Sequence, residues 1–469
     1  MLAIPGALVA ICRKLHTAGF QSYIVGGAVR DSLLNRPVHD WDIATNASPE
    51  DCMALFPKVI PTGLKYGTVT VISESYQVEV TTYRSDGAYR DGRRPESVGF
   101  VSDIATDLSR RDFTINAMAY DPLDERLVDP FGGQHDLKER LIRTVGAASQ
   151  RFDEDALRML RAVRFMAELG FTLDPDIVRE LQPKMMARIS MERIREEFSK
   201  IVLSDGLVDA IRLLKESGLL AVFLPELAAT DIPQNRYHTL TVFEHCLKAA
   251  ELVAPDLTLR LAALLHDIGK PRTRSIGSDG QIHFYRHEAA GSELAQAALL
   301  NMKYPKNFTR RVALLIAQHM SDLNDQTSDK SLRHTIQRVG KENIFLLLDL
   351  HIADRAAGKA LQRPFDDVRF RKRVVAMVHQ APLGLDQLAV NGDQIMKALG
   401  LPEGPLIGTI LQQLLDRVLA EPGLNNERQL IAIARTIAEC GAAEPGEPKQ
   451  KTISPNAAGP GTECPPRLH

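Results

Sequence analysis

The sequence has few cysteines, few aromatic residues and almost no net charge. Its 469 residues include five cysteines, one tryptophan and 6% aromatic residues. No two cysteines form a C-x-x-C pair, which argues against a disulfide framework and a thiolate zinc site and favours a reducing, cytoplasmic setting. A net charge of −2 excludes a uniformly basic nucleic-acid binder. Any contact with nucleic acid must therefore come from local basic patches.

Long apolar segments are missing as well. No apolar run approaches the length of a membrane span, and the N-terminus lacks a charged region followed by an apolar stretch. We therefore expect neither a membrane partner nor a signal peptide. Hydrophobic residues make up 44% of the chain and charged residues 25%, which is ordinary for a globular protein of several domains.

The residue pattern changes at about residue 147. Before this point it predicts mixed helices and strands, and after it long amphipathic helices with few strand signals. The expected early elements are a helix over Leu8–Leu15, a strand over Asp40–Ala44, a helix capped by Ser48, and a hairpin of Thr68–Ile72 with Gln77–Tyr83. The last stretch, 443–469, is rich in Pro, Gly and polar residues and reads as a disordered tail.

Two aspartates separated by one residue follow a glycine pair. Asp40 and Asp42 would share one face of a strand, and two close carboxylates favour a cation between them. Gly26 and Gly27 allow a phosphate to approach the backbone closely. Since Mg²⁺ prefers oxygen ligands and bridges substrate phosphates, this pattern indicates nucleotidyl transfer. Alone, the Asp pair would more simply be a surface turn.

Five motifs in order resemble those of class II tRNA nucleotidyltransferases, the CCA-adding enzymes and bacterial poly(A) polymerases. The resemblance covers roughly residues 20 to 230. The motifs are Val25–Asp31, Asp40–Asp42, Arg110–Ala117, Glu154–Arg158 and Ile189–Ile194. The resemblance implies an α+β protein, in which a small mixed α/β head with a polymerase-beta-like palm precedes an elongated all-α body.

The resemblance implies a role for each motif of the head. Asp40 and Asp42 would be catalytic and hold Mg²⁺, with Glu79 on a neighbouring strand as a third acidic residue. The alternative for Glu79 is a solvated strand residue. Nucleotide binding would involve Gly26, Gly27 and Arg30 at the phosphates, and Arg111, Asp112 and Asn116 at the ribose. Asp112 is alternatively a helix cap.

The motif around Glu154 would read the incoming base. On one continuous helix Glu154, Asp155 and Arg158 share a face, and Arg161 lies one turn later. In the family this face serves as a protein template. Asp155 would accept from the amino group of cytosine or adenine, and Arg158 would donate to the ring nitrogen. The alternative is an ordinary surface ion pair.

The segment 84–99 is long, charged and glycine-bearing. Long loops inside compact domains are commonly functional. In the family a flexible loop here supports the switch from C to A addition, so its presence favours full CCA addition or A addition.

A second set of polar residues resembles the metal site of an HD domain. His266 and Asp267 directly follow an apolar run, and imidazole with carboxylate suits a first-row divalent ion such as Ni²⁺, Mn²⁺, Fe²⁺ or Zn²⁺. Such a domain implies phosphatase or phosphodiesterase activity. His238 and His351 are alternatives for the first ligand. The expected ligands are His245, His266, Asp267, His287, His319 and Asp354.

Two groups of basic residues are candidates for contact with RNA phosphates. Phosphate contacts position nucleic acid without reading its sequence, which suits an enzyme that accepts every tRNA. For the second group a solvated helix face is the preferred interpretation. The groups are Arg188, Arg193, Arg195 and Lys200, then Lys303, Lys306, Arg310 and Arg311.

Together these features predict a cytoplasmic enzyme that adds or repairs CCA at tRNA 3′ ends from CTP and ATP, releasing pyrophosphate, with no DNA partner. Alternatives are A-adding or CC-adding enzymes, a poly(A) polymerase, a phosphohydrolase with an inactive head, and a non-catalytic RNA-binding regulator. The oligomeric state stays open. The expected domains are a head (1–146), a helical neck (147–230), an HD domain (231–365), a C-terminal helical region (366–442) and the tail (443–469).

Overall fold

The computed structural model describes residues 2–87, 98–234, 239–358, 366–380 and 384–441. These residues form two units, one of residues up to Asp325 with Val339–Arg371, and one of Gln326–Arg338 with residues from Lys372 onward. The expected disordered tail, most of the predicted loop 84–99, and His238 lie outside the described residues. Within the described ranges no helix combines the length and apolar character that crossing a membrane requires.

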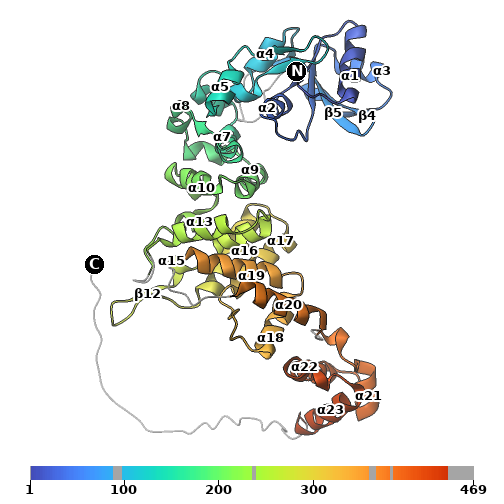
Figure 1. Cartoon of the computed structure of the whole chain (residues 1–469), viewed down its shortest axis with the longest axis vertical. Helices are drawn as coiled ribbons and strands as arrows, with labels where there is room; N and C mark the ends of the chain where they lie inside the picture. Colours follow the sequence, from blue (N-terminus) through green and yellow to red (C-terminus); the bar gives the residue numbers. More distant parts are fainter. Residues whose placement is uncertain (1, 88–97, 235–238, 359–365, 381–383, 442–469) are drawn as a thin grey trace, which may run out of the picture. The chain divides into compact units, whose positions relative to one another are not determined.

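The N-terminal part is a mixed sheet with helices, as the sequence predicts (Figure 1). The sheet order is β3 (Val59–Gly63), β4 (Thr68–Ser73), β5 (Tyr76–Thr82), β2 (Asp42–Thr45), β1 (Ser22–Val25), β8 (Ala119–Asp121) and β9 (Arg126–Val128). Strand β1 is antiparallel to β2 and β8, whereas β2 and β5 are parallel. The predicted hairpin is the antiparallel pair β4–β5.

The helices around this sheet form where their sequences predict them. Ser48 caps α3, and its side chain and that of Asp51 each accept a hydrogen bond from the other's backbone N–H, which satisfies donors at the helix start. A short strand pair flanks the incompletely described loop, β6 (Arg84–Asp86) with β7 (Val98–Phe100). The head helices are α1 (Gly6–Thr17), α2 (Gly27–Leu33), α3 (Pro49–Leu55), α4 (Ile104–Ser109) and α5 (Gly133–Glu139).

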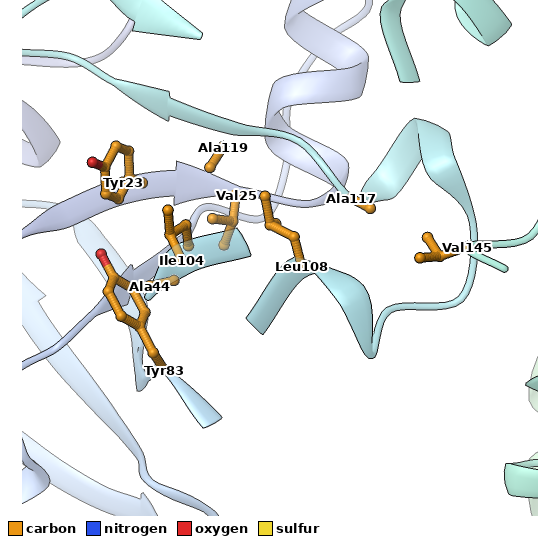
Figure 2. Close-up of a cluster of buried hydrophobic side chains, with 9 residues drawn as sticks. All are labelled: Tyr23, Val25, Ala44, Tyr83, Ile104, Leu108, Ala117, Ala119 and Val145. Atoms are coloured by element: carbon orange, nitrogen blue, oxygen red, sulfur yellow. The ribbon is translucent and has the colours of Figure 1, made fainter. Parts of the chain in front are cut away.

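Apolar side chains fix the sheet that carries the candidate site. Figure 2 shows side chains of β1, β2 and β8 facing Ile104 and Leu108 of α4. On β1, Tyr23 and Val25 belong to this cluster, and Ile24 between them is also fully buried. Since alternate strand residues face opposite sides, both faces of the sheet are covered at β1. The strand that leads into the glycine pair is therefore held rigidly.

Beyond the head, the described residues are mostly helical. The neck contains α6 (Ala148–Glu154), α7 (Leu157–Leu169), α8 (Pro175–Arg179), α9 (Met191–Leu203), α10 (Leu207–Glu216), α11 (Leu220–Phe223) and α12 (Pro225–Ala228). Strand β11 (Thr172–Leu173) pairs in parallel with β10 (Leu141–Ile142), which precedes the neck in the sequence. The predominantly helical character agrees with the predicted pattern after residue 147.

The next region carries the predicted histidines. Its elements are α13 (Val242–Leu252), α14 (Leu257–Leu265), α15 (Lys270–Thr273), β12 (Arg274–Ile276), β13 (Ile282–Phe284), α16 (His287–Asn301), α17 (Lys306–Gln318) and α19 (Ile344–Ala357). Helix α18 (Asp329–Val339) lies between α17 and α19 in the sequence but belongs, up to Arg338, to the second unit. Eight of the nine residues of α14, from Thr258 to Leu265, are buried. Helix α14 is thus a central packing element, and it presents the residues that follow it to the interior.

The C-terminal unit has its own apolar core. Helices α21 (Gly392–Leu399), α22 (Pro405–Ala420) and α23 (Glu427–Gly441) surround a cluster that includes Ile395, Ile410 and Leu430. They follow α20 (Asp367–Gln380) in the chain. A helical segment needs a hydrophobic core of its own to fold independently.

Candidate active sites

The first candidate site begins at the turn after β1. Gly26 has φ of +70°, a conformation that favours glycine, and it precedes α2. A Cβ at this position would approach Arg111 Nη1 to 3.0 Å, so a side chain would crowd the site. On the first turns of α2, Arg30 is buried and its Nη1 donates to Asn116 Oδ1 at 2.7 Å. The turn thus leaves backbone open to a ligand beside two guanidinium groups.

Strand β2 carries Asp42, and the segment directly before it carries Asp40. The strand begins at Asp42, so the predicted strand over Asp40–Ala44 starts too early and Asp40 lies in the preceding segment. The expected alternation along a strand therefore does not orient Asp40, because the hydrogen-bonded ladder begins only at the register pair with β1. Buried Trp41 holds the segment in place, and both carboxylates line the same cavity.

The acidic residues around Asp42 repel one another. Glu79 is the register partner of Asp42 on the parallel strand β5 and is exposed. Burial raises the pKa of Asp42 to about 6, and the charges of Glu79 and Asp40 act in the same direction, opposed by Arg111. Carboxylates in this arrangement are stabilised by a cation among them, and their hard oxygen atoms match Mg²⁺. The residues present therefore fit a divalent cation.

One cavity of about 830 Å³ brings most of the predicted residues together. The cavity is large enough for a nucleotide. Among the predicted residues, Glu79 and Glu154 do not belong to its lining. The predicted residues that line it are Gly26, Gly27, Arg30, Asp40, Asp42, Arg111, Asp112, Asn116, Asp155, Arg158 and Arg161.

Helix α4 positions the arginine pair that follows it. Buried Asp107 accepts from Arg110 Nη2 at 2.8 Å and pairs with Arg111 Nη2 at 3.3 Å. Burial disfavours the charged form of Asp107, yet the two guanidinium groups lower the pKa of this carboxyl. Arg111 Nε has no hydrogen-bond partner within the described part of the chain. Asp107 was not among the predicted site residues, because a single helical aspartate carries no distinguishing pattern.

Both carboxylate oxygens of Asp112 accept hydrogen bonds from other groups of the protein. Its Oδ1 accepts from the backbone N–H of Phe113 at 2.8 Å and from Asn116 Nδ2 at 3.3 Å. Its Oδ2 accepts from Arg161 Nε at 2.7 Å. Burial opposes ionisation, but Arg161 and Arg158 hold the pKa of Asp112 well below its usual range. The carboxylate stays charged and orders the arginines around it.

The predicted continuous helix through Glu154 and Arg158 is wrong. Helix α6 ends at Glu154, Asp155 is extended with φ of −148°, and α7 begins at Leu157. Asp155 therefore turns away from Glu154, which pairs with Arg158. Asp155 instead pairs with Arg193, whose Nη2 lies 2.6 Å from Asp155 Oδ2. Asp155 Oδ1 also accepts from the Leu157 N–H, so the break is stabilised locally.

A buried phenylalanine organises the basic side of the cavity. The ring of Phe165 has the guanidinium carbons of Arg30, Arg161 and Arg164 at 4.9, 5.5 and 4.0 Å from its centroid. Arg164 Nε also donates to buried Glu197 at 2.5 Å. Sequence reasoning missed Phe165 and Glu197. The spacing of Arg161, Arg164 and Phe165 along α7 was the available signal, because residues three and four apart share a helix face.

Helix α9 contributes part of the predicted basic group. Arg193 and Lys200 line the cavity. Arg195 instead donates through Nη1 to the backbone carbonyl of Lys303. In the later basic group, Arg311 Nε donates to Asn343 Oδ1 at 2.6 Å. The first group is thus divided between the cavity and contacts within the protein.

The second candidate site gathers the predicted histidines and aspartates from five places in the chain. They lie on α13, directly after α14, at the start of α16, directly after α17 and on α19. All except Asp354 are buried. Two groups of three side chains that could hold a metal ion share one aspartate. These are His245, His266 and Asp267, and Asp267, His287 and His319.

Short distances join the two groups and Asp354. His245 Nε2 lies 2.8 Å from Asp354 Oδ1, and His266 Nε2 lies 3.5 Å from the same oxygen. His287 Nε2 lies 3.3 Å from Asp267 Oδ1. His287 and His319 are themselves 3.3 Å apart at their Nε2 atoms. The two groups therefore adjoin at Asp267, and Asp354 lies beside His245 and His266 of the first group.

Backbone carbonyls orient three of the imidazole rings. The pairs are His266 Nδ1 with Ala263 O at 2.8 Å, His287 Nδ1 with Phe284 O at 2.8 Å, and His319 Nδ1 with Ile316 O at 2.7 Å. A carbonyl only accepts, so each Nδ1 carries the proton and each Nε2 presents a lone pair when the ring is neutral. This is the usual support for a metal-binding histidine.

Burial and neighbouring charges set the protonation of the site. Burial lowers the pKa of His319 to about 4, with His266 acting in the same direction. Burial opposes the charged forms of His266 and Asp267, but their mutual attraction raises the pKa of His266 and lowers that of Asp267. Lys270 Nζ also lies 2.6 Å from Asp267 Oδ2. His351 belongs to neither group of three.

Comparison with protein families defines the class of this protein. The poly A polymerase head domain model matches residues 22–143, and the model described as “Probable RNA and SrmB- binding site of polymerase A” matches residues 170–230. The HD domain model matches residues 236–358. Together with the fold and the carboxylate site, these matches define a nucleotidyltransferase of the poly(A) polymerase type with an HD domain.

Full-length relatives identify the family. The chain is 36% identical over 428 residues to the CCA-adding enzyme of Geobacillus thermodenitrificans, with 90% of this chain and 94% of that protein covered. The corresponding protein of Lactobacillus johnsonii is 34% identical, with the same coverage of both chains. The chain therefore belongs to the CCA-adding enzyme family.

A solved structure agrees with this assignment. The Bacillus stearothermophilus CCA-adding enzyme in complex with CTP is 31% identical, with a TM-score of 0.68, and the match covers 93% of this chain and 98% of that one. The Thermotoga maritima CCA-adding enzyme complexed with tRNA is 19% identical with a TM-score of 0.55, a likeness of fold. The predicted fold class is confirmed.

Proposed function

We propose that this protein adds CCA to tRNA 3′ ends from CTP and ATP, releases pyrophosphate and selects bases with side chains rather than with a nucleic-acid template. The observation that carries the proposal is the single cavity that contains the glycine turn, the aspartate pair and the Asp155–Arg161 segment. Its size and its charge pattern suit one nucleoside triphosphate. The assignment to CCA-adding enzymes supports the choice of tRNA as acceptor.

The acidic end of the cavity would serve the chemical step. Asp40 and Asp42 would hold Mg²⁺, with Glu79 beside them. A bound ion supplies Lewis acidity toward the phosphates and toward the attacking 3′-hydroxyl. The Gly26–Gly27 backbone and Arg30 would receive the triphosphate. Arg111, whose Nε lacks a partner within the described residues, is suited to donate to a phosphate or the ribose.

The ribose pocket would depend on Asp112 and Asn116. Because the oxygens of Asp112 are already bonded to Asn116, Phe113 and Arg161, this carboxylate acts chiefly by fixing its neighbours. A pocket whose polar groups are pre-arranged for a 2′-hydroxyl rejects the deoxy analogue, because those groups would be left unpaired. Selection of ribonucleotides follows from this arrangement.

The base would meet Asp155 and Arg158, with Arg161 assisting. Cytosine and adenine each present an amino donor beside a ring-nitrogen acceptor, which complements a carboxylate and a guanidinium. Uracil and guanine present a carbonyl to the carboxylate and leave buried groups unpaired. The pairs Asp155–Arg193 and Arg158–Glu154 hold these side chains in position.

Product lengths test this function. Purified protein with Mg²⁺ would receive CTP, ATP or both, with tRNAs that end before CCA or after CC. We expect two added nucleotides from CTP alone on the first tRNA, one from ATP alone on the second, and three from both on the first. No addition of A would favour a CC-adding enzyme, no addition of C an A-adding enzyme, and a long A tract a poly(A) polymerase.

We propose a second, metal-dependent phosphohydrolase activity at the histidine site. The two ligand groups that share Asp267 would hold first-row divalent ions such as Ni²⁺, Mn²⁺, Fe²⁺ or Zn²⁺, which would supply positive charge for phosphoester hydrolysis. Dialysis against a chelator followed by addition of single metals should abolish and restore phosphoester hydrolysis. Hydrolysis that survives full metal removal, verified by elemental analysis, would reject this activity.

We also propose a cytoplasmic location, where tRNA substrates and reduced cysteines occur together.

A further inference from the structure

The histidine site opens into a cavity of about 370 Å³ with an aromatic wall. Its lining includes His245, Asp267 and His287 of the histidine site. Strand β13 and the residue after it contribute His283, Phe284 and Tyr285. A cavity of this size admits one small organic ligand, such as a nucleotide, and excludes a duplex. The hairpin β12–β13 was absent from the sequence predictions.

Two of the wall residues form a flat stacked pair. His283 lies on β13, and Tyr285 directly follows this strand. Their ring centroids are 5.3 Å apart and the rings are within 10° of parallel. Tyr285 is 71% exposed. A core function cannot explain so exposed a ring, in contrast to the stacked Tyr304–Phe308 pair, in which Tyr304 is buried.

Phe284, the residue between them, contacts a lysine that also lines the cavity. Phe284 has Lys270 Nζ 5.6 Å from its ring centroid. Lys270 Nζ donates to Gln234 Oε1 at 2.8 Å and pairs with Asp267. Lys270 and Gln234 also line the cavity. One bound nucleotide could therefore contact both the aromatic side chains of the hairpin and these cationic and amide groups.

We propose that His283 and Tyr285 are a stacking platform for the base of the phosphoester that occupies this cavity. The ligand is a nucleoside phosphate, either a free mononucleotide or the terminal nucleotide of an RNA. Its base stacks on the platform while its phosphate faces the His/Asp cluster, because bases stack on aromatic side chains irrespective of sequence. This specificity role rests on the phosphohydrolase function proposed above and goes beyond it by naming the residues that select a base-bearing substrate.

Binding and kinetics of substituted proteins test the platform. Wild type, Tyr285→Ala and His283→Ala would be titrated calorimetrically with adenosine 2′-monophosphate and with inorganic phosphate, with and without added Mn²⁺. The loss of one stacked base should weaken nucleotide binding about tenfold. Phosphate binding should not change. Hydrolysis should follow the same split, with a raised KM for adenosine 2′,3′-cyclic phosphate and unaltered constants for glycerol 2-phosphate.

Matched variants separate stacking from other effects. Tyr285→Trp keeps a ring and should retain nucleotide binding, and Ile276→Ala, an exposed substitution on β12 of the same hairpin, should behave as wild type. An RNA that ends in a 2′,3′-cyclic phosphate, compared with the mononucleotide, shows which source the platform favours. Equal losses for nucleotide and phosphate, or no loss for either, would overturn the proposal. Nucleotide binding that needs Tyr285, without any hydrolysis, would reject the hydrolase function alone.

Discussion

At the scale of single residues, the candidate nucleotide site holds acidic side chains whose negative charges are only partly compensated by neighbouring arginine. Asp42 lies beside Glu79 across two parallel strands, and burial raises the pKa of Asp42 to about 6. The protein therefore holds a carboxylate in surroundings that disfavour its charge. Such an arrangement lowers the stability of the metal-free fold and is relieved by a bound cation.

The first prediction concerns this charge. A folded-state pKa above the unfolded value means that Asp42 contributes stability at low pH, which is lost as pH rises from about 4 through about 6. Asp42→Asn should therefore raise the unfolding free energy of the metal-free head at pH 7, by at most about 3 kcal/mol. Trp41, the single tryptophan and a neighbour of Asp42, provides a local fluorescence signal for denaturant titrations at pH 4 and pH 7.

Mg²⁺ supplies the control for that experiment. It should stabilise wild type at pH 7 and have little effect on Asp42→Asn. A variant that is less stable than wild type without metal at pH 7 would show that the carboxylate is well compensated, contrary to the account.

The second prediction concerns base choice. Asp155→Ala should permit UTP and GTP to be incorporated, because the acceptor that excludes carbonyl-bearing base edges is gone. The rate with CTP should fall as well, since Arg193 loses its partner. Single-nucleotide incorporation with each of the four triphosphates measures the change, and the exposed neighbour Asp153→Ala is the matched control. Unchanged discrimination would remove Asp155 from the template.

At the scale of secondary-structure elements, the sequence predicted the elements with strong local patterns and missed those set by long-range contacts. Ser48 with Pro49 identified α3 correctly, because capping is local. The break at Asp155 was missed, since only part of its support is local: Asp155 accepts from the Leu157 N–H and also pairs with Arg193, far along the chain. The hairpin β12–β13 was missed because its strands are three residues each. Most residues predicted from the strong motifs line one cavity, whereas Asp107 and Glu197, which pair with arginines of that cavity, were not predicted.

The third prediction concerns the end of α9. Arg260 of α14 donates through Nη1 to the carbonyls of Val202 and Ser204, at 2.8 and 2.7 Å, and so satisfies the last turn of α9. Arg260→Met should cost about 1–3 kcal/mol, because buried carbonyls lose their partner. Hydrogen exchange should become faster in the last turn of α9, the helix that carries Arg193 and Lys200. Exposed Arg179→Met should change neither quantity; an equally stable Arg260→Met would contradict the capping role.

At the scale of the whole molecule, the first unit contains both candidate sites, which are built from different elements. The nucleotide cavity draws on residues from Gly26 to Lys200, and the histidine site on residues from Gln234 to Gly358. Among the residues that the structure describes, none lines both cavities. The sequence revealed this division because each site has its own motifs, although periodicity alone could not show which side chains meet.

The fourth prediction follows from this separation. Asp42→Ala should abolish nucleotide addition and leave phosphoester hydrolysis unchanged. Asp267→Asn, which preserves size within a buried site, should abolish hydrolysis and leave addition unchanged. Parallel assays of both activities on the same preparations measure the split. Loss of both activities in either variant, with the fold intact by circular dichroism, would contradict independent sites.

The central claim is that Asp40 and Asp42 hold divalent cations beside a nucleoside triphosphate. The most direct test is a crystal structure of this protein with CTP and Mg²⁺. We predict metal density on both carboxylates and the triphosphate against the Gly26–Gly27 turn. A triphosphate bound elsewhere, with those carboxylates free of metal, would contradict it.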